Sequence, residues 1–261
     1  MNNIITNFDQ ILKFATDMQV PINKRRGVLR EYLQSKFITA LYEQSDSKKM
    51  SFVGGTSLRL LRGLPRFSED LDFDVLDLSD KEIRVLIENV TGGFNSENIL
   101  TETHAKIADG KTYFELRFPS LLKDLKISTN PREKLMIKVD YSRGWQHQTP
   151  EVVLFSRYGF IANVVTNPLN QLLTQKLTAY VQRNKTQARD LYDVVWLYAQ
   201  GARLDREFIK SNKLGSLVKK AQDKFTLEGA TRDLENKLAP FLFNESEVQK
   251  LQLFNDVLSN L

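Results

Sequence analysis

Apolar side chains recur every three or four residues over residues 23–42, which is the pattern of an amphipathic helix. The positions that define this pattern are Val28, Leu29, Tyr32, Leu33, Phe37, Ile38 and Leu41. Residues 50–53 then predict a short strand, and residues 56–62 predict a helix capped by Thr56 or Ser57. Residues 71–76 alternate apolar and acidic side chains, as a half-buried strand does. The order is therefore helix, strand, Gly54-Gly55 turn, short helix and strand.

The period of the apolar positions changes near residue 166. Before this point the pattern predicts a helix over residues 79–89 capped by Ser79, and strands over residues 113–118, 135–141 and 160–165. After it the pattern predicts helices alone, over residues 168–181, 188–198, 208–225, 227–238 and 246–258. We therefore predict an α+β fold in which residues 1–166 form an α/β domain with leading helices and a mixed sheet. Residues 167–261 form a helical domain.

The composition limits the possible chemistry more than it identifies it. A chain of 261 residues with 41% hydrophobic and 26% charged residues is typical of a soluble globular protein. We expect a cytoplasmic protein, because no apolar run approaches the roughly 18–20 residues that cross a bilayer and the first residues lack the features of a signal peptide. The chain has no cysteine and only two histidines, so a bound metal would be held by oxygen, as Mg²⁺ and Mn²⁺ are.

The formal net charge of +5 permits a nucleic-acid partner without requiring one. Its distribution is uneven, because residues 201–224 carry seven basic against three acidic side chains. The basic residues are Arg203, Arg206, Lys210, Lys213, Lys219, Lys220 and Lys224. Residues 225–261 carry three basic against six acidic side chains, so the carboxyl-terminal part has a basic and an acidic half.

Three aspartates, Asp70, Asp72 and Asp74, lie two residues apart on a predicted strand and therefore point to one face of a sheet. Their mutual repulsion is offset when divalent cations bind between them, as in two-metal phosphoryl-transfer sites. A solvated acidic sheet edge is the alternative interpretation of the same pattern. The residues that precede this strand help to decide between a cation site and an acidic edge.

Gly54 and Gly55 lie directly before a predicted helix start. Residues without side chains let backbone N–H groups approach a phosphate there, and the helix dipole favours its negative charge. Thr56 and Ser57 add hydroxyl donors. A Gly-Gly pair is often only a turn, but here a phosphate-binding turn and an acidic strand are separated by one short helix. The turn and the strand together indicate a site for a nucleotide and its cation more specifically than either feature alone.

The stretch GGTSLRLLRGLPRFSEDLDFDV, residues 54–75, resembles the signature of the AbiEii and MenT nucleotidyltransferase toxins, which belong to the DNA polymerase β-like superfamily. The resemblance continues through LMIKVDYS at residues 135–142 and QKLTAYVQRNKTQARDLYDVVWL at residues 175–197. It implies a polymerase β-like nucleotidyltransferase domain followed by a helical domain.

The resemblance also implies roles for individual residues. It places Gly54, Gly55 and Ser57 on the nucleotide phosphates, with Asp70 and Asp72 as ligands of Mg²⁺ or Mn²⁺. Arg66 and Ser68 match the R-x-S that precedes the aspartates and are expected at the nucleotide site. Asp74 lies outside the two-carboxylate motif.

Three further positions follow from the later blocks, each with a structural alternative. Asp140 matches a third carboxylate that activates the attacking hydroxyl, or it pairs with Lys138 or Arg143. Lys176 matches a lysine that holds the triphosphate, or it is a surface lysine whose stem lies along apolar neighbours. Asp190 is preferred over Asp193 as a catalytic carboxylate, because an i, i+4 pair with Arg189 would explain Asp193.

The resemblance implies transfer of a nucleoside monophosphate from an NTP to RNA, notably the 3′ end of tRNA, by a toxin whose partner is a separately encoded antitoxin. The basic residues 201–224 suit such a phosphate-rich acceptor. Two alternatives remain open: an AMP-adding enzyme with a protein acceptor, and a non-catalytic module that binds nucleotide or nucleic acid. The sequence alone does not select the nucleotide base.

Overall fold

The structure is a computed structural model that describes residues 3–108 and 111–261. The chain divides into two compact units. Unit 1 comprises Met1–Arg62, Phe67–Arg143 and Val152–Thr166, and unit 2 comprises Gly63–Arg66, Gly144–Glu151 and Asn167–Leu261. The division is thus not a single cut, because two short segments from earlier in the chain belong with the later helices. No helix within the described ranges is long and apolar enough to cross a bilayer.

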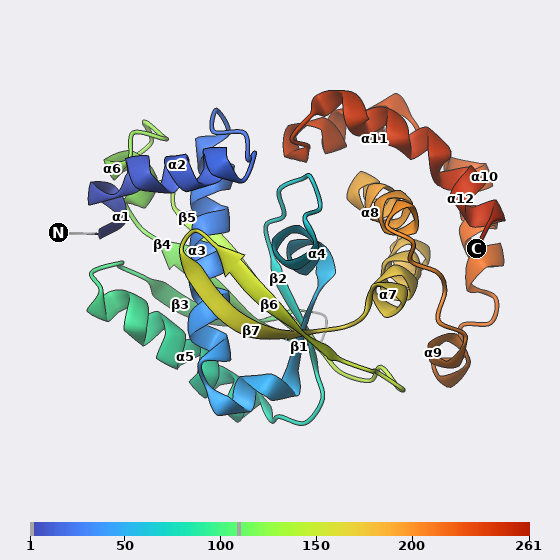
Figure 1. Ribbon diagram of the computed structural model, residues 1–261, viewed down its shortest axis with the longest axis horizontal. Helices are drawn as coiled ribbons and strands as arrows, with labels where there is room; N and C mark the ends of the chain where they lie inside the picture. Colours follow the sequence, from blue (N-terminus) through green and yellow to red (C-terminus); the bar gives the residue numbers. More distant parts are fainter. Residues whose placement is uncertain (1–2, 109–110) are drawn as a thin grey trace. The chain divides into compact units, whose positions relative to one another are not determined.

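Unit 1 is built on a seven-stranded mixed sheet with the order β3-β4-β5-β2-β1-β7-β6 (Figure 1). Its strands are β1 (Met50–Val53), β2 (Leu71–Val75), β3 (Glu102–Ala108), β4 (Lys111–Phe118), β5 (Leu135–Ser142), β6 (Glu151–Arg157) and β7 (Phe160–Thr166). Strand β2 lies antiparallel to β1 and parallel to β5, and β1 runs parallel to β7. The acidic strand is therefore in the middle of the sheet, next to the strand that enters the glycine turn.

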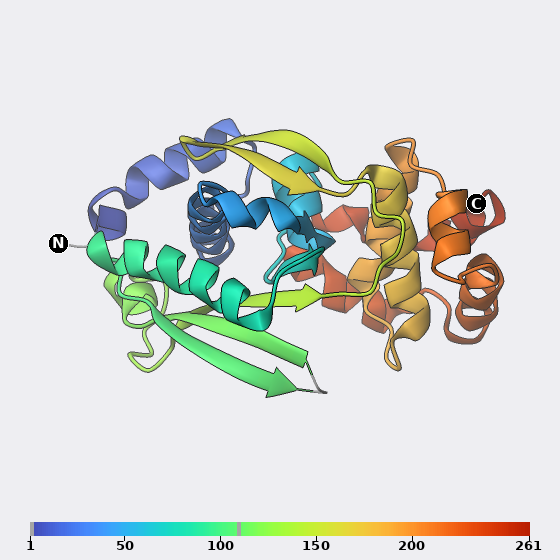
Figure 2. The ribbon, with the colours of Figure 1, turned by 90° about the horizontal axis from the view of Figure 1, so that it is seen from below.

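One long helix provides much of the core of unit 1. The helices of this unit are α1 (Asn3–Thr6), α2 (Phe8–Asp17), α3 (Arg25–Tyr42), α4 (Gly54–Arg62), α5 (Asp80–Ser96) and α6 (Leu121–Asp124), with a 3-10 turn η1 (Ser45–Lys49). Helix α3 contacts β7, β5 and α5 (Figure 2). Its predicted apolar positions are buried, except that Tyr32 is half-buried. Helix α5 begins with the predicted Ser79 cap, whose hydroxyl and the Glu82 side chain form a capping box.

Unit 2 is helical throughout its later part. Its elements are α7 (Leu169–Gln182), α8 (Ala188–Ala199), α9 (Arg206–Ser211), α10 (Leu217–Glu228), α11 (Arg232–Leu238), η2 (Ala239–Phe241), η3 (Glu245–Leu253) and α12 (Phe254–Ser259). The predicted continuous helix over residues 208–225 is wrong, because a turn containing Lys213 at φ 58° separates α9 from α10. The predicted mixed α+β class with a helical carboxyl-terminal part is confirmed.

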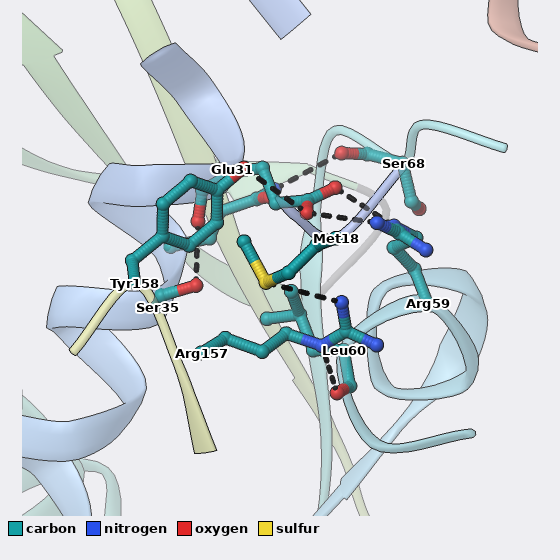
Figure 3. A network of polar contacts seen from close by, with 9 residues as sticks. Met18, Glu31, Ser35, Arg59, Leu60, Ser68, Arg157 and Tyr158 are labelled. Atoms are coloured by element: carbon teal, nitrogen blue, oxygen red, sulfur yellow. Dashed lines mark hydrogen bonds and ion pairs between the residues drawn. The ribbon is translucent and has the colours of Figure 1, made fainter. Parts of the chain in front are cut away.

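A buried polar network fixes α4 within unit 1 (Figure 3). The Glu31 carboxylate on α3 accepts hydrogen bonds from Arg59 Nε at 2.8 Å and Arg59 Nη2 at 3.0 Å. The Tyr158 hydroxyl, from the turn between β6 and β7, donates to the same carboxylate at 3.2 Å. Burial and then the charge of Glu31 raise the pKa of Tyr158, so its hydroxyl stays protonated as a donor. The ion pair therefore holds α4 against α3 from inside the core.

Helix α3 also holds the segment that leads into β2. The Gln34 side chain donates to the backbone oxygen of Ser68 at 3.1 Å and to that of Glu69 at 2.9 Å. Gln34 lies one helical turn from Glu31, so the two side chains share a face of α3. One face of one helix thereby positions both the glycine-turn helix and the residues directly before Asp70.

We expect Glu31→Gln to lower the free energy of unfolding by about 3–5 kcal/mol, because it removes the charged partner that accepts two hydrogen bonds from the buried Arg59. Denaturant unfolding measures this change. Glu97→Gln is the matched control, since Glu97 pairs with Lys36 at 2.7 Å but is 48% exposed. Its loss should stay within about 1 kcal/mol. Equal losses in the two variants would contradict a special role for the buried pair.

Candidate active site

The glycine turn brings the start of α4 directly against the acidic strand. Helix α4 begins at Gly54, immediately after β1, and Gly54 has φ 76°. A Cβ added to Gly54 would lie 2.1 Å from Asp72 Oδ2. No other residue fits this close approach, and the left-handed φ itself favours glycine. The helix thus begins earlier than predicted, and Thr56 and Ser57 lie inside its first turn rather than at its cap.

Both hydroxyls of this first turn are buried, in different environments. Thr56 donates its hydroxyl to the backbone oxygen of Asp70, which ties the turn to the acidic segment. The Ser57 side chain is 1% exposed, and its hydroxyl has no hydrogen-bond partner in the described part of the chain. A buried hydroxyl without a partner costs free energy unless a ligand or water satisfies it. Ser57 is therefore placed to bind a group that enters this turn.

The three aspartates differ in their surroundings. Asp72 lies on β2 and Asp70 directly before it, and both are half-buried. Asp74 is only 3% exposed and accepts a hydrogen bond at 2.9 Å from Ser142 on β5. Asp74 is thus held in a structural contact, which agrees with its place outside the two-carboxylate motif.

Asp140 is the direct neighbour of Asp72 across the parallel β2–β5 pair. It also forms an ion pair with Lys138, whose Nζ lies 2.8 Å from Asp140 Oδ2. Burial by itself would lower the pKa of Lys138, but the Asp140 and Asp70 carboxylates raise it. Arg143 pairs instead with Asp80 at 2.8 Å. Asp140 is therefore paired with Lys138, as the structural alternative predicts, and also lies beside Asp72.

The donor chemistry of this region fits a hard divalent cation. Asp70 and Asp72 offer carboxylate oxygens, and Asp72 lies against the backbone of a helix start that could hold the phosphates bound to such a cation. Among the residues that the structure describes, no group of three or more His, Cys, Asp or Glu side chains is arranged to hold a metal ion. The candidate set is thus the aspartate pair.

Unit 2 contains a second group of charged residues, centred on the buried Asp193. Arg66 donates to both carboxylate oxygens, from Nε at 2.7 Å and from Nη2 at 2.6 Å. Lys176 Nζ lies 2.8 Å from Oδ2 of the same carboxylate. Burial alone would raise the pKa of Asp193, but Arg66 and Lys176 lower it below its usual value. The resemblance places Arg66 at the nucleotide site, and here its guanidinium is buried against Asp193.

This arrangement changes the roles of the other residues in unit 2. Lys176 is 14% exposed and bound to a buried carboxylate, so it is not a freely solvated lysine. Asp190 is also buried, with Arg183 Nε 3.0 Å from its Oδ2. The reason for preferring Asp190 was an Arg189–Asp193 pair, but Asp193 pairs with Arg66 and Lys176 instead. That reason was wrong, and Asp193 is the carboxylate linked to Lys176.

Sequence reasoning missed the residues that hold the site in place. Glu31 and Gln34 lie on the buried side of α3, and Arg59 is buried on α4. Polar residues at core-facing positions of a helix were a usable signal, because buried polar groups require partners. Their partners could not be identified, because they lie far away in the chain.

We expect Gly54→Ala to destabilise the protein more than Gly63→Ala does. Both glycines have a left-handed φ, 76° and 83°, so both variants pay about 1–2 kcal/mol for that conformation. Only at Gly54 does the added Cβ meet another group, the Asp72 carboxylate, since nothing lies within 4 Å at Gly63. Denaturant unfolding measures the free energy of unfolding of both variants, and the difference between their losses is the cost of the contact with Asp72. Equal losses would show that Asp72 can move away without cost.

We expect Asp193→Asn to lower stability near neutral pH by about 3–5 kcal/mol, because it removes the carboxylate that accepts two hydrogen bonds from the buried Arg66. A carboxyl group with a depressed folded-state pKa stabilises fully above its unfolded pKa, about 3.9, and loses this contribution as pH falls through the folded pKa. The difference between wild type and variant should therefore be constant above pH ~5 and shrink below pH ~4. Denaturant unfolding over this range measures it.

Asp233→Asn is the control for this series, since Asp233 is 68% exposed in its pair with Lys237. Its effect should stay within about 1 kcal/mol throughout. A difference for Asp193→Asn that does not change with pH would contradict the ionised, paired carboxylate.

Comparison with known proteins identifies the family of this chain. The family described as "Nucleotidyl transferase AbiEii toxin, Type IV TA system" matches residues 36–253. A Helicobacter pylori protein described as a "putative nucleotidyltransferase" aligns with 90% of this chain and 95% of its own, at 19% identity and TM-score 0.50. JHP933 from Helicobacter pylori aligns with 90% and 92%, at 19% identity and TM-score 0.49. Comparison with curated protein sequences gives no match. The chain therefore belongs to the AbiEii nucleotidyltransferase toxin family of type IV toxin–antitoxin systems.

Proposed function

We propose that this nucleotidyltransferase transfers a nucleoside monophosphate from an NTP to the 3′ end of an RNA, with tRNA as the acceptor. The observation that carries the proposal is the approach of Gly54 to Asp72, next to the buried Ser57 hydroxyl. A helix start with free backbone N–H groups binds phosphate, and a carboxylate pair binds a divalent cation. An NTP bound to Mg²⁺ or Mn²⁺ is a ligand that requires both features side by side.

Different residues of unit 1 bind the phosphates, hold the cation and accept the proton in the proposed transfer. Gly54, Gly55, Thr56 and Ser57 hold the phosphates of the NTP at the first turn of α4. Asp70 and Asp72 would hold Mg²⁺ or Mn²⁺, which when bound neutralises charge on the transferred phosphate. Asp140 accepts the proton of the attacking ribose hydroxyl. The hydroxyl oxygen bonds to the α-phosphorus as the bond from that phosphorus to the leaving pyrophosphate breaks.

Unit 2 contributes charge and position to the proposed reaction. By the resemblance, Lys176 is the proposed contact to the triphosphate, and within unit 2 Asp193 orients Lys176 through their ion pair. Arg66 acts on the same lysine indirectly, because it fixes Asp193 in the core. Asp190, in the first turn of α8, pairs with Arg183 at the end of α7. Ser68, whose backbone oxygen is held by Gln34, remains a candidate contact to the nucleotide.

Exposed cations of unit 2 support a phosphate-rich acceptor. Of the basic residues between 201 and 224, Lys224 donates to the backbone oxygens of Tyr180 and Arg183, and Arg203 lies 4.1 Å from the Tyr198 ring. These two residues have structural roles. The other five are exposed and could each neutralise a phosphate of RNA: Arg206, Lys210, Lys213, Lys219 and Lys220. Such an enzyme acts in the cytoplasm, where NTPs and tRNA are found, and is counteracted there by its antitoxin.

We expect the purified protein to transfer label from an α-³²P NTP to RNA in a total cellular extract, in the presence of Mg²⁺. Asp72→Asn should abolish the transfer, because it removes a cation ligand. Asp77→Asn removes the same charge from an exposed residue beyond the end of β2 and should keep full activity. Testing the four NTPs separately identifies the preferred base. Label in protein instead of RNA would replace the proposed acceptor by a protein hydroxyl.

The same pair of variants tests the acceptor in a bacterium. Expression of the wild type should arrest growth and leave added nucleotides at tRNA 3′ ends. Asp77→Asn should do the same, and Asp72→Asn should do neither. The arrest has a physical basis, since an added nucleotide displaces the hydroxyl that accepts the amino acid, and a misplacement of ~1 Å can cost about 10²-fold in rate. Arrest with unmodified tRNA ends would contradict a tRNA acceptor.

A further inference from the structure

A row of side chains extends from Asp72 across the sheet, away from the glycine turn. Asp72 on β2 is the register partner of Asp140 on β5, and Asp140 is the partner of Tyr113 on β4. Partners in register point to the same face of a sheet. The Tyr113 side chain therefore lies two strand spacings from Asp72, or roughly 10 Å.

This face is the polar side of the sheet. Phe114, Ile137 and Val139, which alternate with the row along β4 and β5, are buried in the core on the opposite side. Tyr113, Lys138 and Asp140 are instead partly exposed. A ligand can reach this row from the solvent side while the strands remain packed.

Lys138 links the aromatic ring to the carboxylate. Its Nζ lies 4.2 Å from the centroid of the Tyr113 ring and 2.8 Å from Asp140 Oδ2. The ring, the ammonium group and the carboxylate thus form one compact cluster, which lies on the side of Asp72 opposite the phosphate-binding turn. The incoming triphosphate and this cluster therefore flank the aspartate pair from opposite sides.

We propose that Tyr113 and Lys138 form the subsite for the last nucleotide of a single-stranded RNA acceptor, an inference that rests on the proposed function. The Tyr113 ring stacks with the terminal base, and the Lys138 ammonium group contacts the phosphate of that nucleotide. Aromatic rings beside cations are how proteins bind single-stranded nucleic acid without reading its sequence. A base stacked on Tyr113 places its own ribose next to Asp140, one strand spacing of about 4.8 Å away.

The position and charge of the Tyr113–Lys138 cluster indicate that it binds the terminal nucleotide of the RNA acceptor. The cluster adjoins the proposed proton acceptor rather than the phosphate-binding turn, so the group that it binds is the attacking one. A base offers a flat π surface to the ring, and an RNA phosphate offers a negative charge to Lys138. A protein acceptor would bring a hydroxyl without a base to stack on the ring.

The test measures binding of a short fluorescein-labelled single-stranded RNA by anisotropy, with Asp72→Asn present throughout so that no turnover occurs. Tyr113→Leu keeps an apolar side chain on β4 but removes the aromatic ring, and should weaken RNA binding about tenfold. Tyr113→Phe should bind RNA as tightly as the parent protein. Lys138→Gln should reduce the slope of log K against log salt by about 0.7, the value for one phosphate contact on a single strand.

Lys134→Ala is the matched control for charge, since Lys134 directly precedes β5 and pairs with the exposed Glu102. It should bind RNA nearly as tightly as the parent. In the active background, Tyr113→Leu should raise the KM for RNA and leave the KM for NTP unchanged. Circular dichroism verifies that each variant is folded.

The outcomes separate this inference from the proposed function. Unchanged RNA affinity in folded Tyr113→Leu would overturn the subsite while leaving RNA transfer by the parent protein intact. A raised KM for NTP in the same variant would also overturn it, by moving the ring to the nucleotide site. A parent protein that neither binds nor extends RNA would instead refute the proposed acceptor itself.

Discussion

The site of unit 1 depends on one buried charge, the carboxylate of Glu31. It lies in the core of the unit, and the cost of removing it from water is offset by two hydrogen bonds from Arg59 and one from Tyr158. Arg59 is in the second half of α4, while Gly54 is its first residue. A helix of this length moves as a rigid body, so an ion pair at one end fixes the position of the other. The contact between Gly54 and Asp72 is thereby set from the core.

The first turn of α4 must be held in a fixed position, because Gly54 lies so close to the Asp72 side chain that a small displacement would change their contact. There is no room for a methyl group between Gly54 and the Asp72 carboxylate, and the nearby Ser57 hydroxyl is buried. Among the described residues this hydroxyl has no hydrogen-bond partner, which is unfavourable unless a ligand or water satisfies it. A phosphate at the helix start would do so. Stability elsewhere in α3 and α4 therefore supports a locally unfavourable arrangement, as functional sites often require.

The sequence could predict the elements that are regular by themselves. Helix α3 and strands β1, β2 and β5 follow clear periodicities, and β1 was placed to the residue. The edge strands β3 and β6 were missed; in β6 the exposed Val152 and Leu154 remove the usual alternation of apolar and polar faces. The aspartate pair and the glycine turn are each visible in the local sequence, and the structure brings Gly54 against Asp72. The Arg66–Asp193 pair joins residues 127 positions apart, and no local pattern could reveal it.

The charged group in unit 2 shows why that missing partner matters. Taken as an i, i+4 helix pair, Asp193 would neutralise a surface arginine and leave Lys176 to solvent. In the structure three cations, Arg66, Lys176 and Arg183, surround two carboxylates, Asp190 and Asp193. Arg66 occupies both oxygens of Asp193, and Lys176 shares one of them. Lys176 is the more exposed of the two cations, at 14% against 1% for Arg66. The buried carboxylate therefore holds the lysine in one orientation while part of its side chain stays open to solvent, and such a lysine is better placed for a charge-assisted contact to an anion than a freely solvated one.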